Sequence, residues 1–263
     1  MRSATGQARA WMVRDRRGSV VVALIGLLSV CGSSVRATGI PDVPVETVKF
    51  SRTDIQLLHG EGYKLGDDTH ELMTLEHVST WKYGSNFAFF DMIEVFDDGT
   101  TVYGEWYTWL NYEKVTGKQI NFDIIDDVAL GAAINAGDDY RAYIGGLTVY
   151  FKVPRFEVLS VDFMAFDERK DDEVTYIITP VWSTRFNLGP AKMWFRGFVD
   201  IIGPEGDRER QVLSEPQLLL DVGHFWGSSD KLYVGMEYHY WDNAFGIKGL
   251  DERVPQAMVM WVF

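Results

Sequence analysis

Beyond residue 52, the chain consists of short segments in which apolar and polar residues alternate. Segments of this kind with a period of two, bounded by Gly, Asp, Asn or Pro, are typical of β-strands whose two faces meet different surroundings. Twelve such segments are predicted: 53–59, 71–81, 87–96, 101–112, 128–135, 140–153, 156–167, 174–186, 191–202, 216–224, 231–241 and 254–263. No stretch after residue 38 holds the roughly 18 consecutive apolar residues of a membrane-spanning helix, which excludes a helical membrane protein.

The number and length of the segments favour a closed barrel. A strand of about 9–11 residues crosses a bilayer, and an even number of antiparallel strands closes without leaving unpaired backbone groups in lipid. The alternation by itself also fits a soluble β-sandwich or a lipocalin-like barrel. Three glycines, Gly131, Gly145 and Gly146, are interpreted as strand kinks or bulges in a curved barrel.

The last strand favours the membrane barrel over the soluble alternatives. Phe263, Trp261, Val259 and Ala257 fall on one face, and Phe263 is the last residue. A final strand with this pattern looks like the sequence that the outer-membrane barrel assembly machinery reads. Other aromatic residues gather near strand ends, as expected for rings at the two membrane interfaces. They are Trp81, Tyr83, Tyr103, Trp106, Trp109, Trp182, Trp194, Tyr238, Tyr240 and Trp241.

The N-terminus reads as an export signal. Arginines precede a short apolar run, Val20 to Val30, that is too short to span a bilayer, and Val35-Arg36-Ala37 offers a cleavage site. Two alternatives are a twin-arginine signal at Arg16-Arg17 and lipidation at Cys31. We therefore predict a cleaved signal peptide over 1–37, a periplasmic lead over 38–52 and a barrel over 53–263.

Composition narrows the class further. The chain has 263 residues, 14% aromatic residues, one Cys and a formal net charge of −13. This composition excludes a disordered chain and a disulfide scaffold, and the acidity argues against nucleic acid as a partner. Cleavage after Ala37 removes six Arg and one Asp, leaving 19 basic and 37 acidic residues and a net charge of −18. An exported, acidic, cysteine-free chain suits the Gram-negative envelope.

If the Phe263 face meets lipid, the polar face of each strand lines the interior, because a mid-bilayer Lys or Arg costs about 2–4 kcal/mol. Strand 191–202 shows this division clearly, with Lys192, Trp194, Arg196 and Asp200 on one face. The predicted substrate-binding residues of the lumen are Glu76, Asp91, Glu105, Arg141, Trp194, Arg196, Asp200, Asp221, Glu237, His239 and Trp241. They could equally form ion pairs that hold a narrow barrel together.

The segment Leu75–Asp91, LEHVSTWKYGSNFAFFD, resembles the signature of the Tsx family of nucleoside-specific outer-membrane channels. Further matches follow in the family's order: Tyr103–Trp106, Arg141–Tyr143, Thr179–Trp182, Gln217–Gly223, Lys231–Tyr238, Tyr240–Asn243 and Asp251–Phe263. Together they cover roughly residues 54–263. Two departures are Ser85, where the family prefers Asp, and the irregular acidic segment 111–128. The resemblance implies a twelve-stranded barrel for passive nucleoside uptake, and some family members serve as phage receptors.

Two other functions are compatible with the sequence. A plugged barrel whose segments 111–127 and 203–215 bind a phage or another partner is one of them. A lipase is another, because His77 and Ser79 share a strand face and Asn86 could orient the histidine. The five histidines are scattered and show no zinc spacing, so no metal or other cofactor is predicted.

We therefore expect an all-β outer-membrane channel, not an enzyme, for nucleosides or similar small polar solutes. The expected partners are outer-membrane lipid and lipopolysaccharide, the assembly machinery through Phe263, the nucleoside and a phage.

Overall fold

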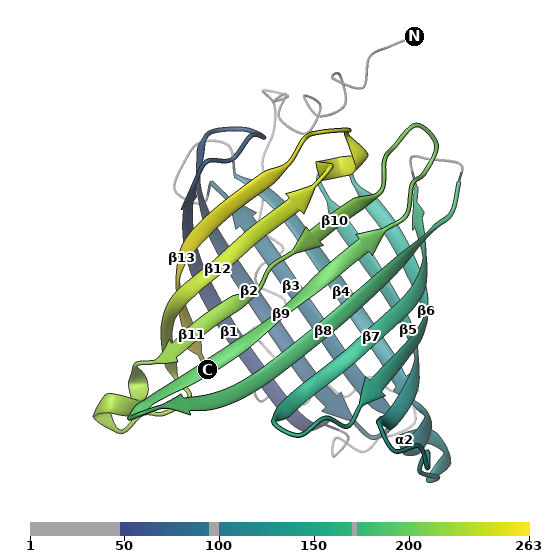
Figure 1. The fold of residues 1–263 in the computed structure, drawn as a ribbon, viewed down its shortest axis with the longest axis vertical. Coiled ribbons are helices and arrows are strands. Elements are labelled where there is room, and N and C mark those ends of the chain that lie inside the picture. Colours follow the sequence, from purple (N-terminus) through teal and green to yellow (C-terminus); the bar gives the residue numbers. More distant parts are fainter. Residues whose placement is uncertain (1–47, 95–99, 170–172) are drawn as a thin grey trace, which may run out of the picture.

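The computed structural model describes residues 48–94, 100–169 and 173–263, and these form an antiparallel β-barrel (Figure 1). The predicted signal peptide and the lead up to residue 47 lie outside the described residues. The strands are β1 (Val48–Glu61), β2 (Thr69–Trp81), β3 (Gly84–Ile93), β4 (Thr101–Asn111), β5 (Ile125–Gly137), β6 (Arg141–Phe151), β7 (Phe156–Glu168), β8 (Thr175–Leu188), β9 (Ala191–Ile202), β10 (Gln211–Ser214), β11 (Gln217–Asp221), β12 (Leu232–Asp242) and β13 (Glu252–Val262).

Each strand pairs with its neighbours in sequence, and pairing of β1 with β13 closes the ring. β10 and β11 both pair with β9 on one side and β12 on the other. They therefore fill a single position, interrupted at Glu215-Pro216, and the ring has twelve positions. Pro216 explains the interruption, since proline has no N–H to give to a ladder.

The twelve predicted segments all correspond to strands of this ring, and the predicted fold class is confirmed. Two boundaries differ. β1 begins at Val48, inside the range predicted as a periplasmic lead, and Gln211–Ser214 is a strand within a segment predicted as a loop. β1 extends further because residues down to Val48 still find partners on β2.

Within the residues that the structure describes, the helices are short and lie in the connections between strands. They are α2 (Tyr112–Thr116), η1 (Gly223–Trp226) and η2 (Ala244–Gly246). In the described part of the chain, no helix combines the length and apolarity needed to cross a membrane.

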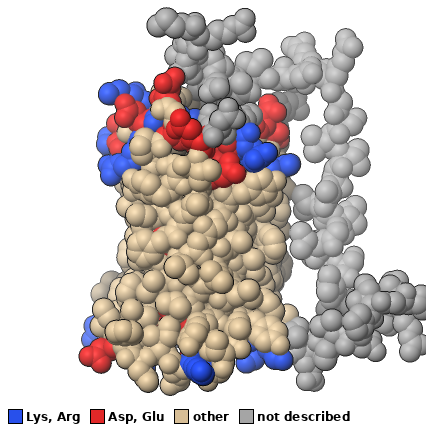
Figure 2. All heavy atoms as spheres, turned by 90° about the vertical axis from the view of Figure 1, so that its right-hand side faces the viewer, with Lys and Arg blue, Asp and Glu red and all other residues tan. Residues whose placement is uncertain are grey.

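The outer surface of the barrel is an apolar belt. Figure 2 shows the charged side chains of the visible face gathered at its two ends, with other residues between them. Outward residues from around the ring are large and exposed: Leu57, Phe90, Trp106, Leu130, Leu147, Phe163, Leu218, Met236, Val259 and Trp261. Water would penalise so much continuous apolar surface, whereas lipid accepts it. The predicted outward face of the last strand is confirmed, with Phe263 67% and Trp261 49% exposed.

Inside, small residues on β5 and β6 make room for large side chains. A Cβ on Gly131 would lie 2.5 Å from the Met164 side chain and 2.9 Å from the ring of Trp109. Register across Gly131, Gly145 and Gly146 is unbroken, and the shift between β5 and β6 lies near Ile125 instead. The interpretation of these glycines as bulges is therefore wrong, because Gly131 serves the packing of the interior.

Candidate functional site in the barrel interior

The pleat of the strands assigns each predicted site residue to a face of the wall. Directly paired residues point to the same side, so the buried residues of β13 fix the interior for the whole ring. The interior receives Glu76, Asp91, Glu105, Trp194, Arg196, Asp200, Asp221, Glu237, His239 and Trp241. The expected polar face of strand 191–202 is confirmed.

Arg141 is the exception. Its neighbour Ala142 is fully buried and pairs with the inward Asn135, so Arg141 points outward, where it is exposed. The prediction that Arg141 lines the lumen is wrong. It is the first residue of β6, at the barrel rim, where a charged side chain reaches water from the outer face at little cost.

The aromatic residues divide between the two faces. Trp106 is exposed on the outside, whereas Tyr103, Trp109, Trp194 and Trp241 pair with inward residues. The expectation that rings near strand ends form membrane-interface girdles is therefore wrong for these four. Alternation by itself does not distinguish an aromatic ring in lipid from one in the interior.

A salt bridge crosses the interior. Arg196 on β9 donates two hydrogen bonds to Glu76 on β2, at 2.7 and 2.5 Å, although β11, β12, β13 and β1 lie between these strands in the ring. Arg52 on β1 donates a further bond to Glu76 at 2.6 Å and lies 3.2 Å from Asp54. The bridge is therefore a chord that separates the β11–β1 side of the interior from the rest.

Behind this chord the interior is filled. Gln217 on β11 donates to Gln56 on β1 at 3.2 Å and to Glu237 on β12 at 2.6 Å, and Gln256 donates to Glu237 at 2.8 Å. An apolar cluster lies in the same part of the barrel, formed by Leu58, Trp194, Leu219, Tyr233, Met258, Met260 and Val262. No solute path passes between residues packed in this way, so any passage runs along the remaining wall.

Trp194 lies in that cluster and is only 2% exposed. The guanidinium carbons of Arg52, Arg185 and Arg196 lie over its ring at 4.7, 4.3 and 4.7 Å from the centroid. Its Nε1 donates to Ser183 at 2.9 Å. A ring covered in this way offers no face on which a solute could stack, so its contacts are structural.

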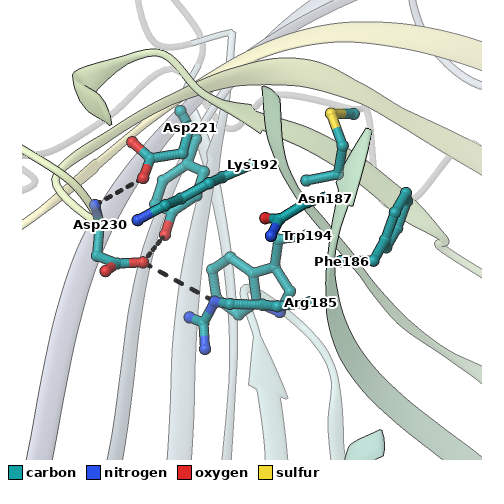
Figure 3. A pocket seen from close by; sticks show the side chains of 9 residues that line it. Arg185, Phe186, Asn187, Lys192, Trp194, Asp221 and Asp230 are labelled. Carbon is teal, nitrogen blue, oxygen red and sulfur yellow. Dashed lines mark hydrogen bonds and ion pairs between the residues drawn. The ribbon is translucent and has the colours of Figure 1, made fainter. Parts of the chain in front are cut away.

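At the end of the barrel where the C-terminus lies, a small hollow opens beside Trp194 (Figure 3). Asp230 joins its walls: its backbone N–H donates to Asp221, and its carboxylate accepts from Tyr233 and lies 4.0 Å from Arg185. The hollow measures about 140 Å³. Ligand pockets ordinarily start at about 300 Å³, so it is too small for a nucleoside.

At the opposite end, the β1–β2 connection folds over the barrel mouth. The backbone N–H groups of Lys64 and Leu65 donate to Glu252 Oε1 at 2.8 and 3.0 Å, and Tyr63 donates its hydroxyl to Gln256 at 2.6 Å. Burial raises the pKa of the Tyr63 phenol, which therefore keeps the proton that it donates. His239 lies between Glu252 and Glu215, at 3.2 and 2.9 Å. Tyr63 was not predicted, because turn residues show no periodicity that would assign them to a face.

The other part of the interior carries acids with neutral partners. Thr74 donates to Asp91 at 2.5 Å, and Thr179 donates to Asp200 at 2.5 Å. Glu105 accepts from the hydroxyl of Tyr103 and, at 2.7 Å, from the amide of Asn135. Asn135 was not predicted, although its place on the inward face of segment 128–135 would have allowed it.

The His77 and Ser79 pair faces outward. Ser79 pairs directly with Asn86 across β2 and β3, so the three residues do share one face. The His77 Nδ1, however, lies 2.8 Å from Thr53 Oγ1, and no hydrogen bond joins His77 to Ser79 among the described contacts. The described residues also contain no group of three or more His, Cys, Asp or Glu that could hold a metal ion.

The apolar outer belt, the closed ring of twelve positions and the charged interior define a transmembrane antiparallel β-barrel. No protein-family model and no curated protein matches the chain. Among solved structures, it is similar to the KdgM porin and to the KdgM porin in complex with disordered oligogalacturonate. Each porin is 8% identical to this chain. The match covers 80% of this chain and 99% of the porin chain, with a TM-score of 0.49.

Proposed function

We propose that this barrel is a passive channel of the Gram-negative outer membrane for nucleosides or similar small polar solutes. The observation that supports it best is the contrast between the apolar outer belt and an interior that carries charged side chains. Burying a carboxylate inside a membrane barrel is unfavourable unless it pairs with a basic side chain or faces water and solutes. Asp91, Glu105 and Asp200 have neutral partners and intermediate exposure, which fits contact with a path.

Nucleosides are proposed because of the resemblance to the Tsx family and the chemistry of the wall. A nucleoside combines a flat base with a hydroxylated sugar. Carboxylates such as Glu105 and Asp91 can accept hydrogen bonds from ribose hydroxyls, and the inward rings of Tyr103 and Tyr107 can contact the base. Stacking of a base on an aromatic ring contributes about 1–3 kcal/mol. Weak sites of this kind permit release as well as entry.

Single-channel conductance of the purified protein in a planar bilayer tests this proposal. We expect a small conductance that nucleosides reduce and that sugars and amino acids of similar size leave unchanged. Glu105→Gln should weaken the nucleoside block, while Asp123→Asn, an exposed acid in the β4–β5 connection, should not. A folded barrel that conducts no ions would refute the channel.

A second candidate is a surface receptor for a phage or another partner. The specific observation in its favour is that the Arg196–Glu76 chord and the β1–β2 connection occupy part of the interior and one mouth. Segments 111–127 and 203–215 were predicted to carry the binding surface, but the β4–β5 and β9–β10 connections lie at opposite ends of the barrel, so only one of them can face outside. Deletion of the outward one, within 112–124 or 203–210, should abolish partner binding without changing conductance.

A further inference from the structure

Four interior carboxylates on the β3–β9 side differ in their partners from the acids that bind arginine. Glu76 and Asp54 contact arginines, and so does Glu168, which accepts from Arg208. Asp91 on β3, Glu105 on β4, Asp162 on β7 and Asp200 on β9 form no ion pair within the part of the chain that the structure describes. Their hydrogen-bond donors, such as Thr74 and Thr179, are neutral and bring no counter-charge.

These carboxylates share one space. Glu105 lies within electrostatic range of Asp91 and Asp200, and Asp200 within range of Asp162, so each is repelled by its neighbours. A barrel wall of low dielectric surrounded by lipid concentrates this field inside. The β3–β9 side of the interior therefore attracts positive charge.

Aromatic rings surround Glu105. The ring centroid of Tyr103 lies 6.0 Å from Phe89, that of Phe87 lies 6.4 Å from Tyr107, and Tyr107 stacks on Trp109 at 5.5 Å. Cations of the chain lie over other rings, those of Trp194, Tyr83, Tyr143 and Tyr240, in the contacts described. A carboxylate among ring faces is the arrangement that proteins use to hold ammonium groups.

An independent observation comes from Asn135, which is 4% exposed. Its amide nitrogen donates to Glu105, whereas its Oδ1 is buried without a hydrogen-bond partner among the described residues. A buried acceptor without a donor is unfavourable. A ligand that brings N–H donors to this point would satisfy it, and the same donors would reach Glu105.

We propose that the interior wall around Glu105, Asn135 and Asp200 is a binding site for small primary ammonium ions. The ammonium group donates to Glu105 and to the free carbonyl oxygen of Asn135 and lies against the rings of Tyr103 and Tyr107. Asp200 adds attraction from the facing wall. As a statement about what the barrel transports, this rests on the proposed channel function; as a statement about binding, it does not.

Saturation-transfer difference NMR on the full chain in maltoside micelles tests the site with three probes of matched size. These are protonated 2-aminoethanol, neutral ethylene glycol and anionic glycolate. We expect saturation transfer to 2-aminoethanol to exceed that to both other probes. The transfer should fall to the level of ethylene glycol in Glu105→Gln/Asp200→Asn and stay unchanged in Asp123→Asn, which loses a charge outside the barrel.

Equal transfer to the three probes in the wild-type protein would overturn the inference, whether or not the double variant folds. So would preference for 2-aminoethanol that persists in a folded Glu105→Gln/Asp200→Asn variant. The channel is judged separately, by conductance and its block by nucleosides. A barrel that binds 2-aminoethanol without conducting ions would refute the channel and support the ammonium site. A channel that nucleosides block but that does not prefer 2-aminoethanol would support the channel and refute the ammonium site.

Discussion

Arg196 and Glu76 meet inside the barrel through two parallel hydrogen bonds of 2.7 and 2.5 Å, from strands that are not neighbours in the ring. Their side chains are 12% and 8% exposed. A pair so nearly removed from water holds its geometry only because both charges are matched, and Arg52 adds a second cation to the same carboxylate. This salt bridge therefore acts as a brace that joins β9 to β2 across the interior of the barrel.

Removing one charge of this brace should destabilise the barrel strongly. We expect Glu76→Gln to lower the free energy of unfolding by about 3–5 kcal/mol, because it leaves Arg196 buried without its counter-ion. Urea unfolding in lipid vesicles measures this. The double variant Glu76→Leu/Arg196→Met should recover most of the loss, since no unpaired charge from this pair remains. Lys248→Gln, which breaks the exposed pair with Glu209, should cost no more than about 1 kcal/mol.

The apolar belt predicts a depth-dependent penalty for charge. Leu147 lies in the middle of β6 and is 52% exposed, so Leu147→Lys should cost about 2–4 kcal/mol of folding free energy in a bilayer. Leu188, the last residue of β8 and 70% exposed, is the matched control, and Leu188→Lys should cost about 0–1 kcal/mol. Equal penalties at the two positions would mean that the belt does not face lipid.

The connection over the mouth should open when Glu252 is removed. Glu252→Ala deletes the acceptor of the Lys64 and Leu65 amides, so the β1–β2 connection loses two of its attachments. We expect faster tryptic cleavage after Lys64, followed by mass spectrometry, while Glu71→Ala on the outer wall leaves the rate unchanged. An unchanged rate in Glu252→Ala would show that Tyr63 holds the connection without Glu252.

Substitutions of Trp194 and Glu105 should distinguish a residue that stabilises the barrel from one that contacts the solute. Trp194→Ala should lower the free energy of unfolding by about 3–5 kcal/mol, because it empties a packed position, and should leave the nucleoside block of conductance unchanged. Glu105→Gln should weaken the block with a smaller effect on unfolding. A weaker block in a folded Trp194→Ala variant would place a solute contact at the covered ring.

The lipase alternative predicts an activity that depends on Ser79. We expect the purified barrel to release no fatty acid from phospholipid micelles, and Ser79→Ala to leave conductance unchanged. The reason is that the His77 ring is engaged by Thr53 instead of Ser79. Fatty acid release that disappears in Ser79→Ala would make the protein an enzyme.

The sequence predicted the orientation of side chains correctly where a strand crosses the lipid, because lipid requires apolar residues on the outer face. Each residue on the outer face of the last strand, from Ala257 to Phe263, must be apolar, and a period of two then assigns the opposite face to the interior. The rule weakens at the rim, where charge meets water on both faces, and this explains why Arg141 was placed on the wrong side. It also fails for a strand as short as β10, which shows no period before Pro216 interrupts it.

The barrel, and the face on which Glu105, Arg196 and Glu237 lie, could be predicted from the sequence, because both follow from local alternation and the cost of charge in lipid. Which of these residues meet depends on how the ring closes. Arg196 reaches Glu76 and covers Trp194 because closure of the ring brings β9 across from β2, and strand periodicity carries no information on contacts across a lumen. The same closure leaves Glu105 and Asp200 on the other side of the chord, without a cation of their own in the described chain.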